Sequence, residues 1–256
     1  MLFRNLKAEL KAGRKLLGCW ASLGNAAAVE CAAIGGFDVI VLDWEHGMVD
    51  RSNALPLLLA ARAHGCGVIV RVPDQRVAEF KFCLDMGVDG VIIPMTANAK
   101  EAKAIVDACR YPPHGTRGAA PGVIRASDYG LQSKDYIERH VSDLLIIPQI
   151  EHVDAIEEIA AMGAIDGVDM LFIGPSDLSA SMHMLGTSDF KPVMAQVERA
   201  AKAIKQAGLY LASIQVPTMD AAGLFKAGYD MIVGASDATL LRAAAQNYVK
   251  NSGRGH

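Results

Sequence analysis

Short apolar runs alternate with longer, Ala-rich amphipathic stretches eight times along this chain of 256 residues. Several short runs are rich in Val and Ile and lack clean alternation, which is typical of parallel strands buried on both faces. Eight strand–helix units in succession predict an α/β fold, a closed (β/α)8 TIM barrel. The candidate strands are Leu17–Leu23, Val39–Asp43, Val68–Val72, Gly90–Met95, Leu144–Gln149, Met170–Gly174, Leu209–Gln215 and Met231–Ala235. The candidate helices are Ala26–Ile34, Ala54–Ala63, Val77–Met86, Ala99–Cys109, Val153–Met162, Val193–Ala207, Met219–Ala227 and Ala238–Tyr248.

A short echo marks the junctions between helices and strands. It reads Ile34-Gly-Gly-Phe-Asp-Val at one junction and Ala227-Gly-Tyr-Asp-Met-Ile at another, with glycine at the helix end. No Pro/Ser-rich linker divides the chain, so we expect a single domain over residues 1–256. The one long irregular connection runs from Arg110 to about Ser127 and follows the fourth helix, so it starts at the end of the barrel opposite the strand carboxyl ends.

Charge and composition exclude several classes of partner. The formal net charge is −3 without a large basic block, which argues against nucleic acid and anionic membranes. No apolar run is long enough to span a membrane, and the amphipathic segment Met1–Lys11 lacks the features of a signal peptide. The five cysteines form no CxxC pair, so we expect free thiols in a reducing cytoplasm and no zinc site built on cysteine.

Chemistry in a parallel barrel gathers at the carboxyl ends of the strands. Glu151 and Asp177 follow adjacent candidate strands there, so their carboxylates can converge. A pair of oxygen ligands without His or Cys suits Mg²⁺, Mn²⁺ or Co²⁺. The alternatives are a salt bridge for Glu151 and a helix cap for Asp177.

Three further polar residues invite a functional and a structural interpretation. Arg71 lies inside an apolar strand and either stabilises a developing oxyanion or pairs with Asp43 or Glu45. His46 follows a strand and lies beside acids, where a general base could sit, although an isolated histidine is more often structural. Asp85 near the end of a candidate helix opposes the helix dipole, which hints at another duty.

Weaker signals come from a turn and from the lysines. The segment Gly174-Pro175-Ser176 precedes a helix, and free amides there could hold a carboxylate. No strand end presents a lysine, which argues against a Schiff-base mechanism.

Taken together, six segments resemble the HpcH/HpaI aldolase family of the phosphoenolpyruvate/pyruvate barrel superfamily. They occur in order, at matching spacing, and the likeness covers nearly the whole chain. The segments are Leu42-Asp43-Trp44-Glu45-His46, Arg71-Val72-Pro73, Ile93-Pro94-Met95, Tyr111-Pro-Pro-His-Gly-Thr-Arg-Gly118, Gln149-Ile150-Glu151 and Phe172-Ile173-Gly174-Pro175-Ser176-Asp177-Leu178-Ser179.

The resemblance implies a role for each matching residue. Glu151 and Asp177 match the ligands of a divalent metal. His46 matches the catalytic base, with metal-bound hydroxide as the other candidate, and Asp85 matches the acid that raises its basicity. Arg71 matches the residue that stabilises the transition state. The positions that match substrate contacts are Trp20, Gln149, Gly174, Pro175, Ser176 and Asp177. Trp44 departs from relatives with a small residue, so we expect it to alter the entrance.

The resemblance also implies a reaction and an assembly. The reaction is reversible aldol cleavage of 4-hydroxy-2-oxo acids to pyruvate, or an analogue such as hydroxypyruvate, and an aldehyde through an enolate. Such proteins are trimers or dimers of trimers that exchange the last helix, here about Ala238–Tyr248. The alternatives are an acyl-CoA ester lyase, an oxaloacetate decarboxylase and a non-catalytic barrel that binds a small acid. The aldehyde is not identified by the sequence.

Overall fold

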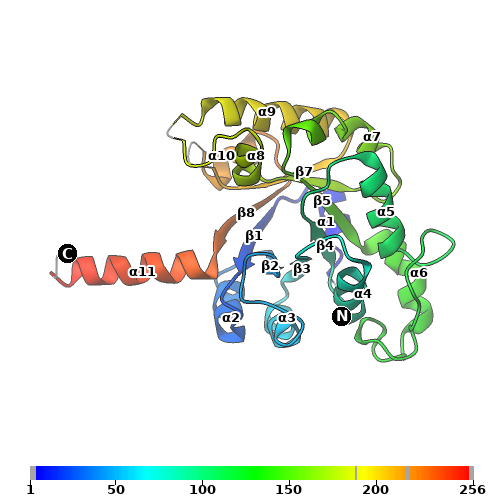
Figure 1. The fold of residues 1–256 in the computed structure, drawn as a ribbon. Coiled ribbons are helices and arrows are strands. Elements are labelled where there is room, and N and C mark those ends of the chain that lie inside the picture. Colours follow the sequence, from blue (N-terminus) through cyan, green and yellow to red (C-terminus); the bar gives the residue numbers. More distant parts are fainter. Residues whose placement is uncertain (1–3, 188, 217–218, 254–256) are drawn as a thin grey trace.

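Eight parallel strands close into a barrel in which each strand pairs with the next and β8 pairs with β1 (Figure 1). The computed structural model describes residues 4–187, 189–216 and 219–253. The (β/α)8 prediction is confirmed, and each strand lies within two residues of its expected bounds. The strands are β1 (Leu16–Ala21), β2 (Val39–Asp43), β3 (Gly67–Arg71), β4 (Gly90–Ile93), β5 (Leu145–Ile150), β6 (Met170–Ile173), β7 (Tyr210–Ile214) and β8 (Met231–Ser236).

Helices surround the barrel, and four of them have the predicted bounds. None of the helices in the described ranges is long and apolar enough to cross a membrane. The helices are α1 (Leu6–Lys11), α2 (Ala26–Ile34), α3 (Ala54–Ala63), α4 (Val77–Met86), α5 (Ala99–Cys109), α6 (Ser133–Asp143), α7 (Ile159–Gly163), α8 (Pro175–Ser181), α9 (Lys191–Gln206), α10 (Ala221–Lys226) and α11 (Asp237–Asn251), with the 3₁₀ turns η1 (Arg125–Ser127) and η2 (Val153–Ile156).

Two helical predictions need correction. The expected helix Val153–Met162 is interrupted and forms η2 and α7 instead, because the chain passes through a 3₁₀ turn before the α-helical bonds begin. Helix α6 was not among the eight expected helices. Its sequence is polar overall and it buries only Tyr136 and His140, so few apolar residues mark it as a helix.

The lead-in segment closes the amino end of the barrel. Leu6 and Leu10 of α1 are buried in the same core cluster as interior side chains of the strands. The side chain of Asn5 caps this helix by accepting the Ala8 N–H at 2.8 Å. The first three residues of the predicted amphipathic segment, Met1–Phe3, lie outside the described residues.

The aspartate in the repeated junction motif has a structural reason. Asp38, Asp89 and Asp230 each stand immediately before an even-numbered strand and accept a backbone N–H from the strand before it. For Asp89 the donor is the N–H of Val68, at 2.7 Å. Each carboxylate accepts a hydrogen bond from a strand amide at the amino end of the barrel that has no partner in the β-ladder. The motif therefore links neighbouring strands there.

A buried arginine anchors the long connection between α5 and α6. The side chain of Arg117 is fully buried and donates to Asp85 at 2.6 Å and to the Tyr136 hydroxyl at 2.9 Å. Its guanidinium also lies 4.4 Å from the centre of the Tyr111 ring. Burial and the positive charge of Arg117 lower the pKa of His140 to about 3, so this neighbour is neutral and adds no second charge.

The first test concerns this anchor. Replacing Arg117 with Leu leaves Asp85 without its partner and removes the hydrogen bond to Tyr136, so the free energy of unfolding should fall by about 3 kcal/mol. Urea unfolding measures the loss, and limited proteolysis should then cut within the connection between α5 and α6. The control is Arg139→Leu on the exposed face of α6, which should change neither. Equal stability of both variants would show that Arg117 does not hold the connection.

Candidate active site

A buried carboxylate stands where β5 ends. Glu151 is 3% exposed. Its Oε2 accepts the Met95 N–H at 2.7 Å, and its Oε1 accepts the Gln149 side-chain amide at 2.9 Å. Within the described ranges no Lys, Arg or His forms an ion pair with it, so its salt-bridge interpretation is not supported. Two neutral donors thus hold a buried negative charge.

The surroundings of Glu151 disfavour its ionised form. Burial, together with the nearby charges of Asp177 and Glu45, raises the pKa of Glu151 to about 7, although the Met95 N–H and the charge of Arg71 oppose the shift. Burial also raises the pKa of Glu45, against the attraction of Arg71. Three carboxylates therefore repel one another at one end of the barrel, and a cation near Glu151 would relieve that repulsion.

The described residues around Glu151 leave room and an unpaired acceptor beside its carboxylate. A Cβ on Gly174 would lie 2.7 Å from Glu151 Oε1, so the carboxylate can rest against the end of β6 only because residue 174 is glycine. The Gln149 side-chain oxygen is buried and accepts no hydrogen bond from the described part of the chain. Such an acceptor needs a donor from water or a ligand.

The donor set suits a hard cation that keeps other ligands. The described residues contain no cluster of three or more His, Cys, Asp and Glu side chains that would form a complete metal cage. Glu151 and Asp177 would therefore supply two carboxylates, and water or substrate would supply the remaining ligands. Mg²⁺ and Mn²⁺ bind in this way, with few protein carboxylates. The residues present fit such an ion.

Arg71 is held in place on several sides. It pairs across β2 and β3 with Asp43, through hydrogen bonds of 2.9 and 2.8 Å. A third nitrogen lies 3.1 Å from Glu45, and the guanidinium stacks 4.3 Å from the Trp20 ring centre. The structural alternative is thus present, but it does not exclude the functional one. Two of the five guanidinium N–H groups donate to Asp43 and the third nitrogen forms an ion pair with Glu45, so N–H groups remain for a substrate.

His46 and Asp85 lie in different parts of the chain's fold. His46 follows β2, donates its backbone N–H to Asp43 at 3.3 Å, and exposes 63% of its side chain, with Nε2 3.9 Å from Glu45. Asp85 lies in the last turn of α4, near the opposite end of the barrel, and binds Arg117. His46 and Arg71 share the neighbours Asp43 and Glu45, whereas Asp85 of the same chain lies away from His46.

The two tryptophans differ in position. Trp20 in β1 lies beside Arg71 and makes an edge contact with Phe172, with ring centres 5.9 Å apart. Trp44 is only 8% exposed and packs against Phe82 at 5.8 Å in the layer between barrel and helices. The expectation that Trp44 alters the entrance is therefore wrong, because its side chain faces outward from the barrel.

The turn after β6 places the other predicted contacts. Gly174 donates its N–H to Ile150 of β5 at 3.1 Å, and Pro175 is buried at the first position of α8. No described side chain caps this helix, so Asp177 does not act as a cap. Asp177 lies in its first turn, next to the exposed Ser176.

The structure adds site residues that sequence reasoning treated only as neighbours. Glu45 was considered as a partner of Arg71, and it also adds negative charge next to Glu151. Met95 holds Glu151 through its backbone, in a left-handed conformation with φ of 52°. A non-glycine residue in that conformation carries no sequence signal that would have identified it.

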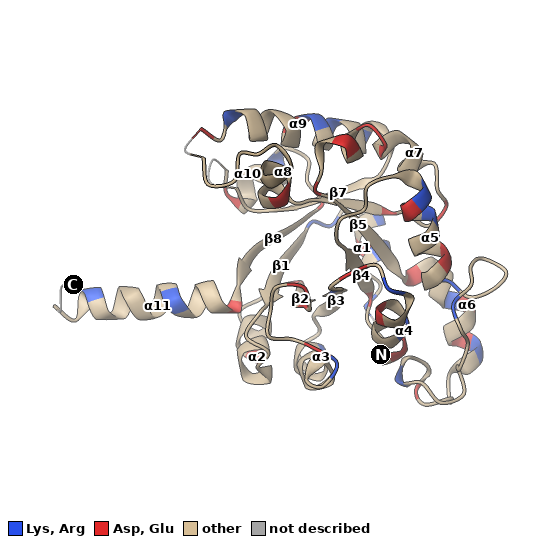
Figure 2. Cartoon of the chain, viewed as in Figure 1, with Lys and Arg blue, Asp and Glu red and all other residues tan. Residues whose placement is uncertain are grey.

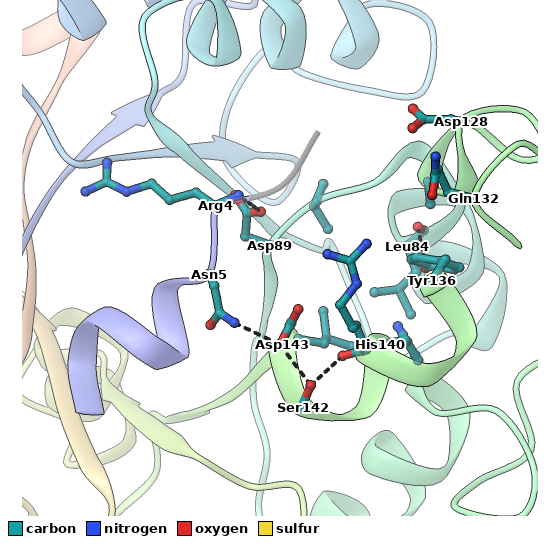
Figure 3. Close-up of a pocket in the computed structure, with 14 residues that line it drawn as sticks. Arg4, Asn5, Leu84, Asp89, Asp128, Gln132, Tyr136, His140, Ser142 and Asp143 are labelled. Atoms are coloured by element: carbon teal, nitrogen blue, oxygen red, sulfur yellow. Dashed lines mark hydrogen bonds between the residues drawn. The ribbon is translucent and has the colours of Figure 1, made fainter. Parts of the chain in front are cut away.

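A cavity of about 560 Å³ lies at the other end of the barrel (Figure 3). Its polar lining is joined internally: Asn5 and Ser142 each donate to Asp143 at 2.8 Å, and the backbone N–H of Arg4 donates to Asp89 at 3.0 Å. It shares no residue with the candidate site. The bonds around it connect α1, α6 and the start of β4, as expected of the stabilising end of a barrel.

Comparisons with known proteins agree with this geometry. The family model described as HpcH/HpaI aldolase/citrate lyase matches residues 16–244. A hydroxypyruvate/pyruvate aldolase of Chromohalobacter salexigens is 34% identical over 91% of both chains, and a 5-keto-4-deoxy-D-glucarate aldolase of Shigella boydii is 33% identical over 94% of this chain and 93% of the relative.

A solved structure gives the same result. The crystal structure of a HpcH/HpaI aldolase/citrate lyase family protein from Burkholderia cenocepacia superposes with a TM-score of 0.91 and 31% identity, over 98% of this chain and all of the other. The resemblance read from the six segments is therefore confirmed: this chain belongs to the HpcH/HpaI aldolase/citrate lyase family.

Proposed function

We propose that this carbon–carbon lyase is a metal-dependent aldolase that cleaves 4-hydroxy-2-oxo acids to pyruvate, or hydroxypyruvate, and an aldehyde. The observation that carries the proposal is the buried Glu151 carboxylate, which has neutral donors but no ion-pair partner in the described structure and lies near Asp177. The names of the relatives, a hydroxypyruvate/pyruvate aldolase and a 5-keto-4-deoxy-D-glucarate aldolase, support the same substrate class.

The chain's own groups suit the formation of an enolate. Glu151 and Asp177 would hold Mg²⁺, Mn²⁺ or Co²⁺, which when bound supplies Lewis-acid polarisation of the 2-oxo acid. Arg71 presents its remaining N–H groups to the oxygen on which negative charge develops. Because Asp43 and Trp20 already orient the guanidinium, little reorganisation is needed when that charge appears.

The rest of the site binds the substrate and moves protons. The Gln149 side-chain oxygen accepts a hydrogen bond from the substrate or from a water molecule. The turn formed by Gly174, Pro175 and Ser176 contacts the carboxylate end of the acid. His46 is exposed at the mouth and takes or returns the proton on the aldehyde side.

The second test is metal removal. EDTA should abolish the release of pyruvate from a panel of 4-hydroxy-2-oxo acids, and Mg²⁺, Mn²⁺ or Co²⁺ should restore it. In the metal-free protein Glu151 becomes protonated as the pH falls through about 7, so protons compete with the ion there. Affinity for Mn²⁺ should therefore weaken by roughly tenfold per pH unit below that point.

The control for metal removal is Glu151→Gln, which cannot ionise and should bind no Mn²⁺ at any pH. Full turnover by metal-free protein would overturn the proposed mechanism. If the protein binds Mn²⁺ but cleaves no acid of the panel, the metal site stands and the proposed substrate class is wrong.

The third test concerns Arg71. Arg71→Ala should retain Mn²⁺ binding and lose aldol cleavage by at least about a hundredfold in kcat, because the guanidinium acts mainly when charge develops in the transition state. Steady-state kinetics and a Mn²⁺ titration measure the two properties. Near-native kcat in the variant would assign Arg71 a purely structural role in pairing with Asp43 and Glu45.

Helix α11 supports an assembly of several copies. It projects away from the barrel (Figure 1), and Asp237 is its only buried residue in the described range. Leu241 and Tyr248 on it are 64% and 79% exposed. Helices α2 and α3 carry little charge (Figure 2) and expose Ile34 and Leu59. Exposed apolar faces of this kind are typical of protein–protein interfaces. We propose a homotrimer, or a dimer of trimers, in which neighbouring subunits exchange α11.

The same assembly gives Asp85 a role. Asp85 lies in the last turn of α4, at the end of the barrel opposite His46 of the same chain. The pairing that the family resemblance implies therefore requires Asp85 from a neighbouring subunit. There it would orient His46 and raise its basicity. The free cysteines, four of them buried, suit the reducing cytoplasm that we propose as the location.

The fourth test is complementation between two inactive variants. His46→Ala and Asp85→Asn should each slow deuterium uptake into the pyruvate methyl group, as followed by NMR. When the two variants are co-expressed, random assembly gives about a quarter of the sites an intact His46 and an intact Asp85 from different chains, so exchange should partly return. Each variant assembled alone is the control.

No recovery in mixed assemblies would place the two residues in separate roles. Normal exchange in Asp85→Asn, together with reduced stability, would leave Asp85 only as the counter-ion of Arg117.

A further inference from the structure

The turn after β4 combines an unusual backbone conformation with a contact to the candidate metal ligand. Met95 has φ of 52°, which a residue with a side chain rarely adopts. Its N–H lies 2.7 Å from Glu151 Oε2 and donates to it. Strained backbone at a functional site persists only where surrounding contacts impose it.

One contact that restrains this turn comes from the neighbouring connection. Gln75, between β3 and α4, donates its side-chain amide to the Met95 carbonyl at 3.0 Å and to the Pro94 carbonyl at 3.3 Å. Two successive carbonyls are thus held by one amide. Pro94 has no N–H and Met95 uses its own for Glu151, so side chains hold the turn: Gln75 through its two bonds, and Thr96 through a bond from its hydroxyl to the Ile93 carbonyl at 3.4 Å.

The path from Gln75 to the carboxylate is short and directional. The Pro94 carbonyl and the Met95 N–H belong to the same rigid peptide plane, so the bond from Gln75 to that carbonyl also orients the N–H. The N–H then fixes one oxygen of Glu151, while Gln149 fixes the other at 2.9 Å. Groups that orient a metal ligand in this way set the affinity of the site without touching the ion.

We propose that Gln75 is a positioning residue for Glu151, acting through the backbone of Met95 to aim the carboxylate at a divalent ion. The inference rests on the proposed role of Glu151 as a metal ligand. A Gln75 that merely tied two loops together would affect stability, whereas a positioning Gln75 affects metal affinity in the folded, metal-free protein.

The test measures Mn²⁺ affinity by titration of the full chain without substrate. Gln75→Leu removes both donated bonds without adding charge, and it should weaken Mn²⁺ binding by roughly tenfold or more. Gln75→Glu has the same shape but only acceptors. It should also weaken binding, although its added negative charge would by itself attract the ion. The control, Gln132→Leu, makes the same change beside the cavity at the other end of the barrel and should leave affinity unchanged.

The outcomes separate this inference from the proposed function. Weaker Mn²⁺ binding in both Gln75 variants, with unchanged circular dichroism and thermal midpoint of the metal-free protein, supports the positioning role. Native affinity in Gln75→Leu, tighter binding in Gln75→Glu, or a loss confined to thermal stability overturns it while the metal site stands. Wild-type protein that binds no Mn²⁺ overturns both.

Discussion

Closure of the barrel between β8 and β1 is the constraint on which the rest of the structure depends. Closure requires the two strands to approach closely at Gly18, where a Cβ would lie 3.2 Å from Val233. Once eight parallel strands form a ring, all their carboxyl ends face one side. Arg71 and Glu151, eighty residues apart in the chain, then act in one electrostatic environment. Without the ring, each would be an isolated polar residue after a strand.

The two ends of the closed barrel differ in how their carboxylates are paired. At the amino end the chain itself supplies the partners: burial raises the pKa of Asp89 as well, but Asp89 accepts bonds from Arg62, Val68 and Arg4. At the carboxyl end, acids outnumber the cation that faces them, and burial raises the pKa of Glu151 to about 7. Unrelieved repulsion of this kind lowers stability, so it is expected where a ligand, and not the chain, supplies the missing charge.

The sequence predicts those features of the fold and the site that depend on residues close together in the chain. Strands and most helices were predictable, because burial on one or both faces leaves a period in the residues. Helix α6 was missed because its sequence is polar overall, and the partner of Asp85 was missed because Arg117 lies in a loop thirty-two residues later. The positions of Arg71, His46, Glu151 and Asp177 followed from topology alone. The left-handed Met95 did not, since tertiary contacts impose its conformation.

Arg71 shows why a structural ion pair and a functional cation can be the same residue. A guanidinium with no partner in this buried position would be costly to desolvate and free to rotate. Asp43 fixes it in one plane through two hydrogen bonds, and Trp20 covers one face. The acids cancel part of its charge, but they hold the remaining N–H groups in a constant direction. For an oxygen that becomes negative only during the reaction, a donor already held in position contributes more than a free one, because no reorganisation accompanies the change in charge.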